Sequence, residues 1–208
     1  MKNITAQVTL LSDRLHELRR WQDRLVVGIA GAPGSGKSTL AGELAKRMNV
    51  QKVPTVVVPM DGFHLDNAVL EARGLLPRKG APESFDANGF LSLMRRIRAG
   101  EEVFAPVFDR TRDIAIAGAQ EVAPWHRVVI VEGNYLLLDE APWSALADLW
   151  DVSVYLDVEL PELRARLIQR WLSHNLSRAA ATRRAEANDL VNATRVIERR
   201  LEADHVLT

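Results

Sequence analysis

A glycine-rich segment followed by lysine and serine constrains this chain more than any other feature of its sequence. Residues 31–39 read GAPGSGKST and match the phosphate-loop pattern G-x-x-x-x-G-K-[ST]. The apolar run before it, residues 25–30, predicts a buried strand, and residues 37–48 predict a helix. A glycine-rich turn leading into a helix N-terminus directs backbone N–H groups and the positive end of the helix dipole at polyphosphate. We therefore expect ATP to bind at Gly31, Ala32, Pro33, Gly34, Ser35, Gly36, Lys37, Ser38 and Thr39.

Two residues of this pattern, and one residue at the end of a later strand, have predicted chemical roles. Lys37 is expected to reach the β- and γ-phosphates, and the Ser38 hydroxyl to bind Mg²⁺. Glu132 ends the apolar run 128–131, an arrangement in which the acid binds Mg²⁺ directly or through water. A carboxylate at this position could instead cap the next helix.

Asp61 follows the β-branched run at residues 53–58, which predicts a second strand. Proteins with parallel α/β sheets place their chemistry at the carboxyl ends of strands, so Asp61 would lie close to the phosphate loop if the two strands are near neighbours. The alternative is that Asp61 makes an Asx turn before Gly62 or caps the segment that follows.

Composition narrows the class of protein further. The 208 residues, 47% hydrophobic and 26% charged, suit one globular α/β domain. With 27 basic and 27 acidic side chains, we expect neither nucleic acid nor an anionic membrane as a partner. The absence of cysteine excludes disulfides, thiolate catalysis and cysteine-ligated metals. No apolar run reaches 18 residues and the first residues lack a signal-peptide layout, so we expect a cytoplasmic protein.

The remaining patterns predict strands that alternate with helices, hence a three-layer α/β fold with a parallel sheet of about five strands in one domain spanning residues 1–208. An amphipathic helix is expected at residues 5–21, where it could cover one side of the sheet or support a homodimer. Residues 75–88 predict a long loop, either functional or disordered. Residues 103–108 and 114–116 predict a small hairpin whose charged turn, 109–113, could be merely solvated.

A long helix is expected to begin at Pro161, because proline is tolerated in the first turn. It carries Arg164, Arg166 and Arg170, and a polar, alanine-rich stretch at 173–189 adds further arginines. We expect residues 164–189 to form a lid that closes over ATP and supplies positive charge to the transferring phosphoryl group. Arginines are also common on ordinary exposed helix faces.

Five segments together resemble the uridine kinase, phosphoribulokinase and pantothenate kinase family of P-loop kinases, over nearly the whole chain. They are the phosphate loop, MDGFH at 60–64, RKGAPESFD at 78–86, APVFD at 105–109 and VEG at 131–133. Within that family the chain is most similar to a bacterial subgroup labelled fructose transport system kinase or fructokinase. The resemblance implies a P-loop NTPase fold and transfer of the ATP γ-phosphoryl group to an alcohol of a small metabolite.

The resemblance also implies catalytic roles for four residues. Asp61 matches the aspartate that accepts the proton of the acceptor hydroxyl, while Lys37, Arg166 and Arg170 would neutralise the transferring group. Nucleoside kinases of the family carry Asp-His-Pro where this chain has residues 80–82, Gly-Ala-Pro, and a histidine where it has Asp113. These departures disfavour uridine as the acceptor.

A pocket for a hydroxyl-rich acceptor needs polar partners, because each buried substrate hydroxyl must be paired. The candidates are His64, Glu83, Asp109, Arg112 and Asn134, with Asn188 and Asn192 as lesser ones. The leading hypothesis is an ATP-dependent kinase of a sugar-like metabolite. Pantothenate or a nucleoside is the alternative acceptor, and a regulatory ATPase without acceptor chemistry is the alternative class.

Overall fold

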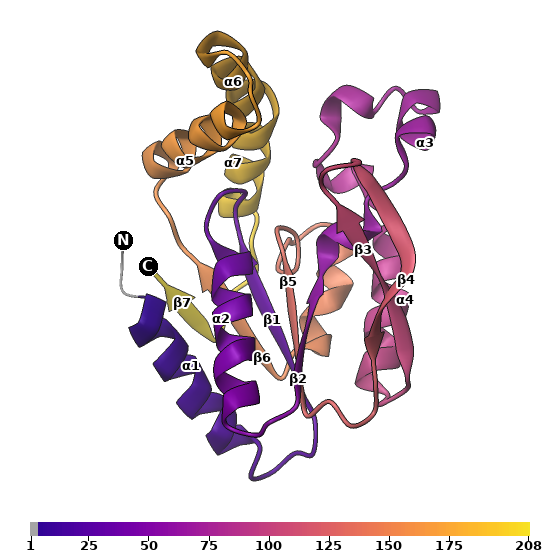
Figure 1. The fold of residues 1–208 in the computed structure, drawn as a ribbon, viewed down its shortest axis with the longest axis vertical. Coiled ribbons are helices and arrows are strands. Elements are labelled where there is room, and N and C mark those ends of the chain that lie inside the picture. The colour runs from indigo at the N-terminus through magenta and orange to yellow at the C-terminus, as the bar shows by residue number, and fades with distance from the viewer. Residues whose placement is uncertain (1–3) are drawn as a thin grey trace.

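A computed structural model describes residues 4–208 and is built around a five-stranded parallel sheet (Figure 1). The order is β2-β5-β1-β6-β7, so β5 lies between the strands that precede the phosphate loop and Asp61. Both β1 and β5 are buried along their whole length, which explains their continuous apolar sequences. The predicted parallel sheet is confirmed; its strands are β1 Leu25–Gly31, β2 Thr55–Pro59, β5 Val128–Gly133, β6 Val152–Leu156 and β7 His205–Leu207.

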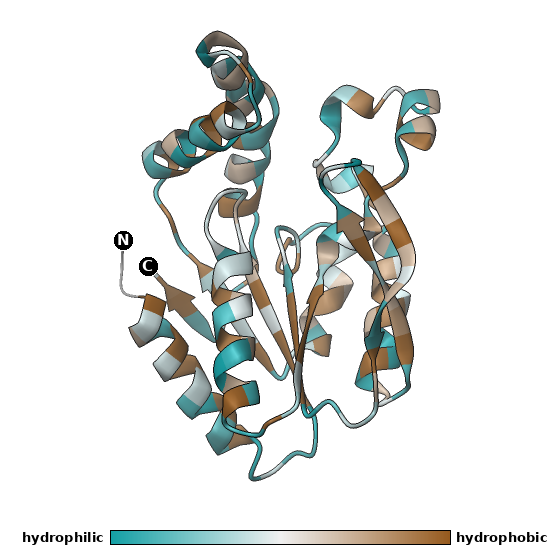
Figure 2. Ribbon diagram, in the orientation of Figure 1, coloured by the Kyte–Doolittle hydropathy of each residue, from teal (hydrophilic) through white to brown (hydrophobic). Residues whose placement is uncertain are grey.

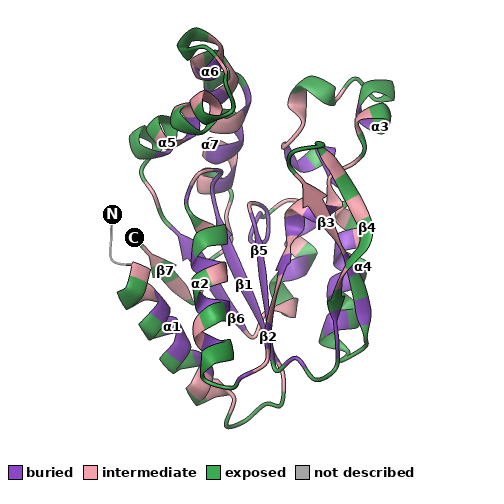
Figure 3. Ribbon diagram, viewed as in Figure 1, coloured by how far each residue is buried: buried purple, intermediate pink, exposed green. Residues whose placement is uncertain are grey.

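Helices cover both faces of this sheet and complete the three layers. One apolar cluster joins β1, β5 and β6 to α1 (Ile4–Leu18) and α2 (Lys37–Val50). A second cluster joins the opposite face to α4 (Ala87–Arg98) and η4 (Trp143–Leu149). The central strands of the sheet are therefore largely hydrophobic in Figure 2 and buried in Figure 3. Within residues 4–208, no helix is long and apolar enough to cross a membrane.

The N-terminal helix packs through the face that its sequence predicts, with Val8, Leu11 and Leu15 buried. It ends at Leu18, earlier than the expected Trp21. Trp21 lies beyond the helix with 83% of its surface exposed, so it does not belong to the core.

The predicted hairpin exists as a separate two-stranded antiparallel sheet, β3 (Val103–Asp109) and β4 (Ile114–Val122). Its register shifts between Ala105 and Val107, around Pro106, which has no N–H to donate to the ladder. β4 continues to Val122, well past the expected residue 116.

Residues 75–88, expected as a long loop, contain two short 3₁₀ helices, η2 (Leu76–Arg78) and η3 (Pro82–Ser84). Backbone hydrogen bonds tie this stretch to the segment after β2: Leu65 N–H donates to Ser84 O at 2.9 Å, and Asp86 N–H to Phe63 O at 2.8 Å. Two further short helices, η1 (Met60–Phe63) and α3 (Asn67–Ala72), complete this part of the chain.

The segment expected as a lid is mostly helical, with a short connection at residues 174–177. It comprises α5 (Leu160–Ser173), α6 (Arg178–Arg184), the π-helical turn η5 (Ala185–Asp189) and α7 (Leu190–Glu198), with proline in the first turn of α5 as predicted. In Figure 1 these helices form an arm above the carboxyl ends of the strands, opposite a second projection made by α3 and the β3–β4 hairpin.

Gly62, which follows Asp61 in η1, lies against the β3 backbone of the hairpin at Pro106 and Val107. A Cβ at position 62 would lie 2.1 Å from the Pro106 carbonyl oxygen, a backbone atom that cannot rotate away. We expect Gly62→Ala to lower the free energy of unfolding by about 3 kcal/mol, because overpacking of this kind forces backbone shifts. Urea denaturation followed by circular dichroism measures it.

Gly42→Ala provides the matched control, since a Cβ at this position of helix α2 would meet no heavy atom within 4 Å among residues 4–208, apart from its chain neighbours and the nearby helix backbone. Removing a glycine from a helix interior should raise stability by about 0.5–1 kcal/mol. Equal stabilities of the two variants would contradict the close packing of β3 on η1.

Candidate active site

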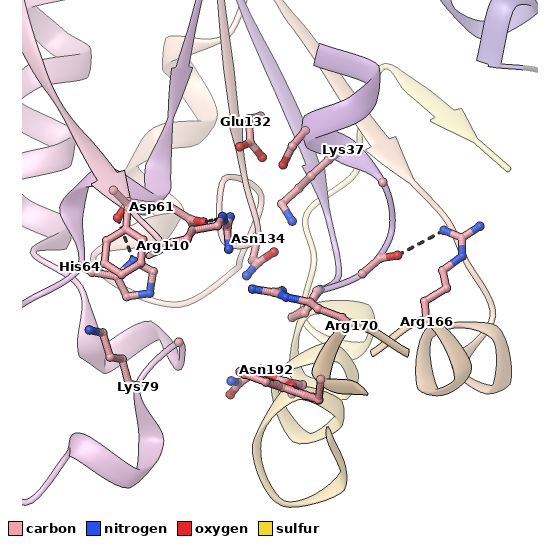
Figure 4. Close-up of a pocket in the computed structure, with 18 of the residues that line it drawn as sticks. Lys37, Asp61, His64, Lys79, Arg110, Glu132, Asn134, Arg166, Arg170 and Asn192 are labelled. Atoms are coloured by element: carbon pink, nitrogen blue, oxygen red, sulfur yellow. Dashed lines mark hydrogen bonds and ion pairs between the residues drawn. The ribbon is translucent and has the colours of Figure 1, made fainter. Parts of the chain in front are cut away.

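A cavity of about 410 Å³ opens at the carboxyl ends of the strands, between the arm and the hairpin (Figure 4). The phosphate loop, η1, the end of β5, the β3–β4 turn and the arm all contribute side chains to it. It combines the predicted Lys37, Ser38, Asp61 and Glu132 in one site.

The phosphate loop has the backbone that polyphosphate binding requires. Gly34 and Gly36 adopt φ of 81° and 99°, a region that other residues rarely enter, and no side chain caps the N-terminus of α2. A Cβ on Gly31 would lie 2.6 Å from Ser35 Oγ, so only glycine leaves this hydroxyl its place. Within the described residues, the buried Ser35 Oγ has no hydrogen-bond partner. An uncapped helix end beside an unpaired donor fits a bound phosphate.

Lys37, Ser38 and Glu132 interact with one another in the cavity. Burial raises the pKa of Glu132, and the positive charge of Lys37 and a hydrogen bond with Ser38 oppose that rise. Burial lowers the pKa of Lys37, which Glu132 and Asp61 oppose. A hydroxyl and a carboxylate are the hard oxygen donors that Mg²⁺ accepts alongside phosphate oxygens, so Ser38 and Glu132 fit the metal that the sequence predicts.

Asp61 lies in η1 and pairs with Arg110 of the β3–β4 turn: Arg110 Nη2 donates to Asp61 Oδ2 at 2.5 Å. Its side chain is 22% exposed and faces the cavity, so the alternative of a local turn-forming role does not describe it. Among the described residues, Asp61 Oδ1 has no hydrogen-bond partner, so it can accept from a ligand. Strand β5, rather than direct pairing of β1 with β2, brings Asp61 and the phosphate loop to the same edge.

Two of the five predicted acceptor residues line the cavity. The ring of His64 stacks on Phe85 and Phe108, with centroids 4.0 and 4.6 Å away, and its Nδ1 lies 2.8 Å from the Asp61 carbonyl. Burial lowers the pKa of His64, so it is neutral at pH 7. Asn134 also faces the cavity, and its buried Oδ1 has no partner among the described residues.

Three predicted acceptor residues lie outside this cavity. Asp109 accepts hydrogen bonds from the backbone N–H groups of Thr111 and Arg112 and pairs with the Arg112 side chain at 2.7 Å, so both are occupied in holding the turn. Glu83 of η3 pairs with Arg195 at 2.5 Å and does not line this cavity. A solvated turn, the alternative for residues 109–113, thus describes Asp109 and Arg112 but not Arg110.

The two predicted lid arginines lie differently. Arg166 donates to the carbonyls of Gly34 and Ser35 at 3.2 and 3.0 Å and braces the phosphate loop from the rim (Figure 4). Arg170 points into the centre. Burial and the nearby Arg110 lower its pKa, while Asp189 and Asp61 oppose this. Among residues 4–208, it forms no ion pair.

Sequence reasoning missed several cavity residues, above all Arg110 and Lys79. Lys79 pairs with Asp113 at 2.9 Å and lies 5.1 Å from the centre of the Phe108 ring. The lid touches this stretch too, because Asn188 donates to the Lys79 carbonyl at 2.8 Å. The motif RKGAPESFD contained Lys79, but no pattern distinguished it from its neighbours.

The parallel sheet, the glycine-rich loop and the carboxylates at two strand ends define a P-loop nucleotide-binding protein. A model of the phosphoribulokinase and uridine kinase family matches residues 26–192. The chain belongs to this family, whose members are kinases that phosphorylate hydroxyl groups and use ATP.

Individual relatives agree with this assignment. A Schizosaccharomyces pombe protein named "putative uridine kinase" is 39% identical, with 95% of this chain and 88% of the relative covered. A crystal structure from Silicibacter sp. TM1040, titled "putative fructose transport system kinase", is 52% identical with a TM-score of 0.92, covering 97% and 98% of the two chains. A pantothenate kinase of Rhodococcus erythropolis is 36% identical over 71% of this chain. The match covers 48% of that relative's length.

Proposed function

We propose that this kinase transfers the γ-phosphoryl group of ATP, with Mg²⁺, to a hydroxyl of a sugar-like metabolite. One observation carries the proposal: the carboxylate of Asp61 shares a cavity with Lys37 and Glu132, so an acid suited to bind an alcohol lies beside a polyphosphate site. The name of the Silicibacter relative, a fructose transport system kinase, supports a sugar.

The residues have complementary tasks in such a transfer. Mg·ATP, when bound, supplies the phosphoryl group. Asp61 Oδ1 accepts the hydroxyl proton as the acceptor oxygen bonds to the γ-phosphorus and the bond to the ADP oxygen breaks. Lys37 and Arg170 line the same cavity and would stabilise the negative charge that accumulates on the peripheral phosphoryl oxygens. Ser38 and Glu132 are the proposed metal ligands.

Two alternatives remain in view. Pantothenate or a nucleoside changes the acceptor but not the chemistry, and relatives with those names motivate both. A regulatory ATPase would need no acceptor pocket, whereas His64, Phe85 and Phe108 extend the cavity beyond the phosphate loop. This extension favours a kinase.

Acceptor-dependent ADP formation tests the proposal. The purified protein and its Asp61→Asn variant are assayed with Mg-ATP and a panel of ketoses, aldoses, polyols, sugar phosphates, pantothenate and nucleosides. Turnover that requires a sugar-like acceptor and collapses in the variant, with ATP still bound, supports the proposal. ATP hydrolysis that needs no acceptor and is unchanged in the variant would favour a regulatory ATPase over a kinase.

A further inference from the structure

Two ion pairs, Asp61–Arg110 and Lys79–Asp113, lie in the part of the cavity that faces η1 and the β3–β4 turn, here called the acceptor half. Their four formal charges sum to zero. The first pair still offers both kinds of partner to a ligand, because Arg110 and Asp61 keep 53% and 22% of their side-chain surfaces exposed. The second offers mainly a carboxylate, since Asp113 is 54% exposed and Lys79 only 10%.

The other charged residues of the cavity lie on the phosphate loop, at the end of β5 and on the arm. Positive charges exceed negative ones here by two: Lys37, Arg166, Arg170 and Arg184 against Glu132 and Asp189. Excess positive charge is therefore concentrated where a polyphosphate with its metal carries a net negative charge. In the acceptor half, each of the two cations is paired with a carboxylate.

Uncharged rings complete the acceptor half. His64 lies against Phe85 and Phe108, and Lys79 is placed over the Phe108 ring. Burial keeps His64 neutral at pH 7 by lowering its pKa. Aromatic faces beside paired donors and acceptors suit a molecule with C–H faces and several hydroxyls, since each hydroxyl both donates and accepts.

We propose that the acceptor is an uncharged polyhydroxylated molecule, a free sugar or polyol, and that Asp113 determines this specificity by neutralising Lys79. The inference rests on the proposed kinase function. A phosphate or carboxylate on the acceptor would have to compete with Asp113 for Lys79, whose Nζ is already bonded, and would meet the negative charges of Asp61 and Asp113 in a partly buried site. Hydroxyls bind without breaking either pair.

Asp113→Asn tests this directly. Asparagine tolerates the left-handed conformation of position 113, where φ is 57°, and it can keep a hydrogen bond with Asn67. The variant removes the carboxylate that balances Lys79, while the hydrogen bonds from Lys79 to Asn67 and to the carbonyl of residue 113 can persist, so the net charge of the acceptor half rises by one. The measured quantity is the ratio of kcat/KM for a phosphate ester or sugar acid to kcat/KM for its parent free sugar. We expect this ratio to be at least tenfold higher in the variant than in the wild type.

Asp109→Asn is the matched control, because Asp109 belongs to the same turn but pairs with Arg112 outside the cavity. Its ratio should stay within twofold of wild type. The assay uses ketoses, aldoses and polyols, each with its phosphate ester and sugar acid, together with pantothenate and nucleosides. Calorimetric titration of the same compounds with a non-hydrolysable ATP analogue gives a second readout that needs no turnover.

Wild-type preference for the free sugar or polyol in both measurements, reduced in Asp113→Asn alone, supports the inference. Three results overturn the inference while the kinase function stands. The first is Asp61-dependent turnover confined to phosphate esters, carboxylates or nucleosides. The others are an unchanged ratio in Asp113→Asn and tighter calorimetric binding of the anionic compound than of its parent sugar. ATP hydrolysis that neither an acceptor nor Asp61→Asn affects overturns the proposed function, and this inference with it.

Discussion

Asp61→Asn is expected to lower kcat by about 10³-fold, the loss that follows when a positioned general base is removed. Asparagine has nearly the same shape and can still accept a hydrogen bond from Arg110, so the geometry of η1 should persist. It cannot take the proton of an attacking hydroxyl. Steady-state ADP formation with the best acceptor of the panel measures kcat, and calorimetry with ATP measures nucleotide affinity.

Nucleotide affinity should change little in this variant, because the contacts expected for ATP come from the phosphate loop rather than from η1. Stability should change little as well, since Asp61 pairs with an arginine whose side chain is 53% exposed, and exposed pairs contribute about 0–1 kcal/mol. Asp109→Asn serves as the control carboxylate outside the cavity. A kcat within threefold of wild type would remove Asp61 from the role of base.

The phosphate loop and the two strand-end acids could be predicted because each is a local pattern with one structural outcome. A buried strand delivers whatever follows it to the carboxyl edge of the sheet, and the parallel order brings Asp61 and Glu132 together there. The sequence did not show that β5 separates β1 from β2, because strand order depends on long-range packing.

The acceptor half could not be predicted residue by residue. In the charged turn, Asp109 and Arg112 bond to each other while Arg110 reaches across to Asp61, a division set by the hairpin geometry and not by composition. Glu83 of η3 pairs with Arg195 of α7, far along the chain. In both places a tertiary contact decides the direction of a side chain.

The lid arginines give the second large expected effect, because Arg166 and Arg170 lie in different places in the cavity. We expect Arg170→Gln to lower kcat by about 10³-fold, the lower end of the range for an arginine that stabilises a transferring phosphoryl group. Arg170 lies at the centre of the cavity, without an ion pair among the described residues, so its charge is available to a substrate. The KM for ATP should change only a few-fold.

Arg166→Gln should show the opposite pattern, because this guanidinium holds the carbonyls of Gly34 and Ser35 and pairs with Glu162. Its loss should loosen the phosphate loop and raise the KM for ATP several-fold more than it lowers kcat. Arg164→Gln is the matched control on the same helix, because Arg164 pairs with Glu186 away from the cavity. This variant should leave both constants within twofold of wild type. A collapse of kcat in Arg166→Gln with near-normal turnover in Arg170→Gln would reverse the assignment. It would also imply that the arm moves before transfer, since Arg166 reaches a phosphoryl group only after releasing the loop carbonyls.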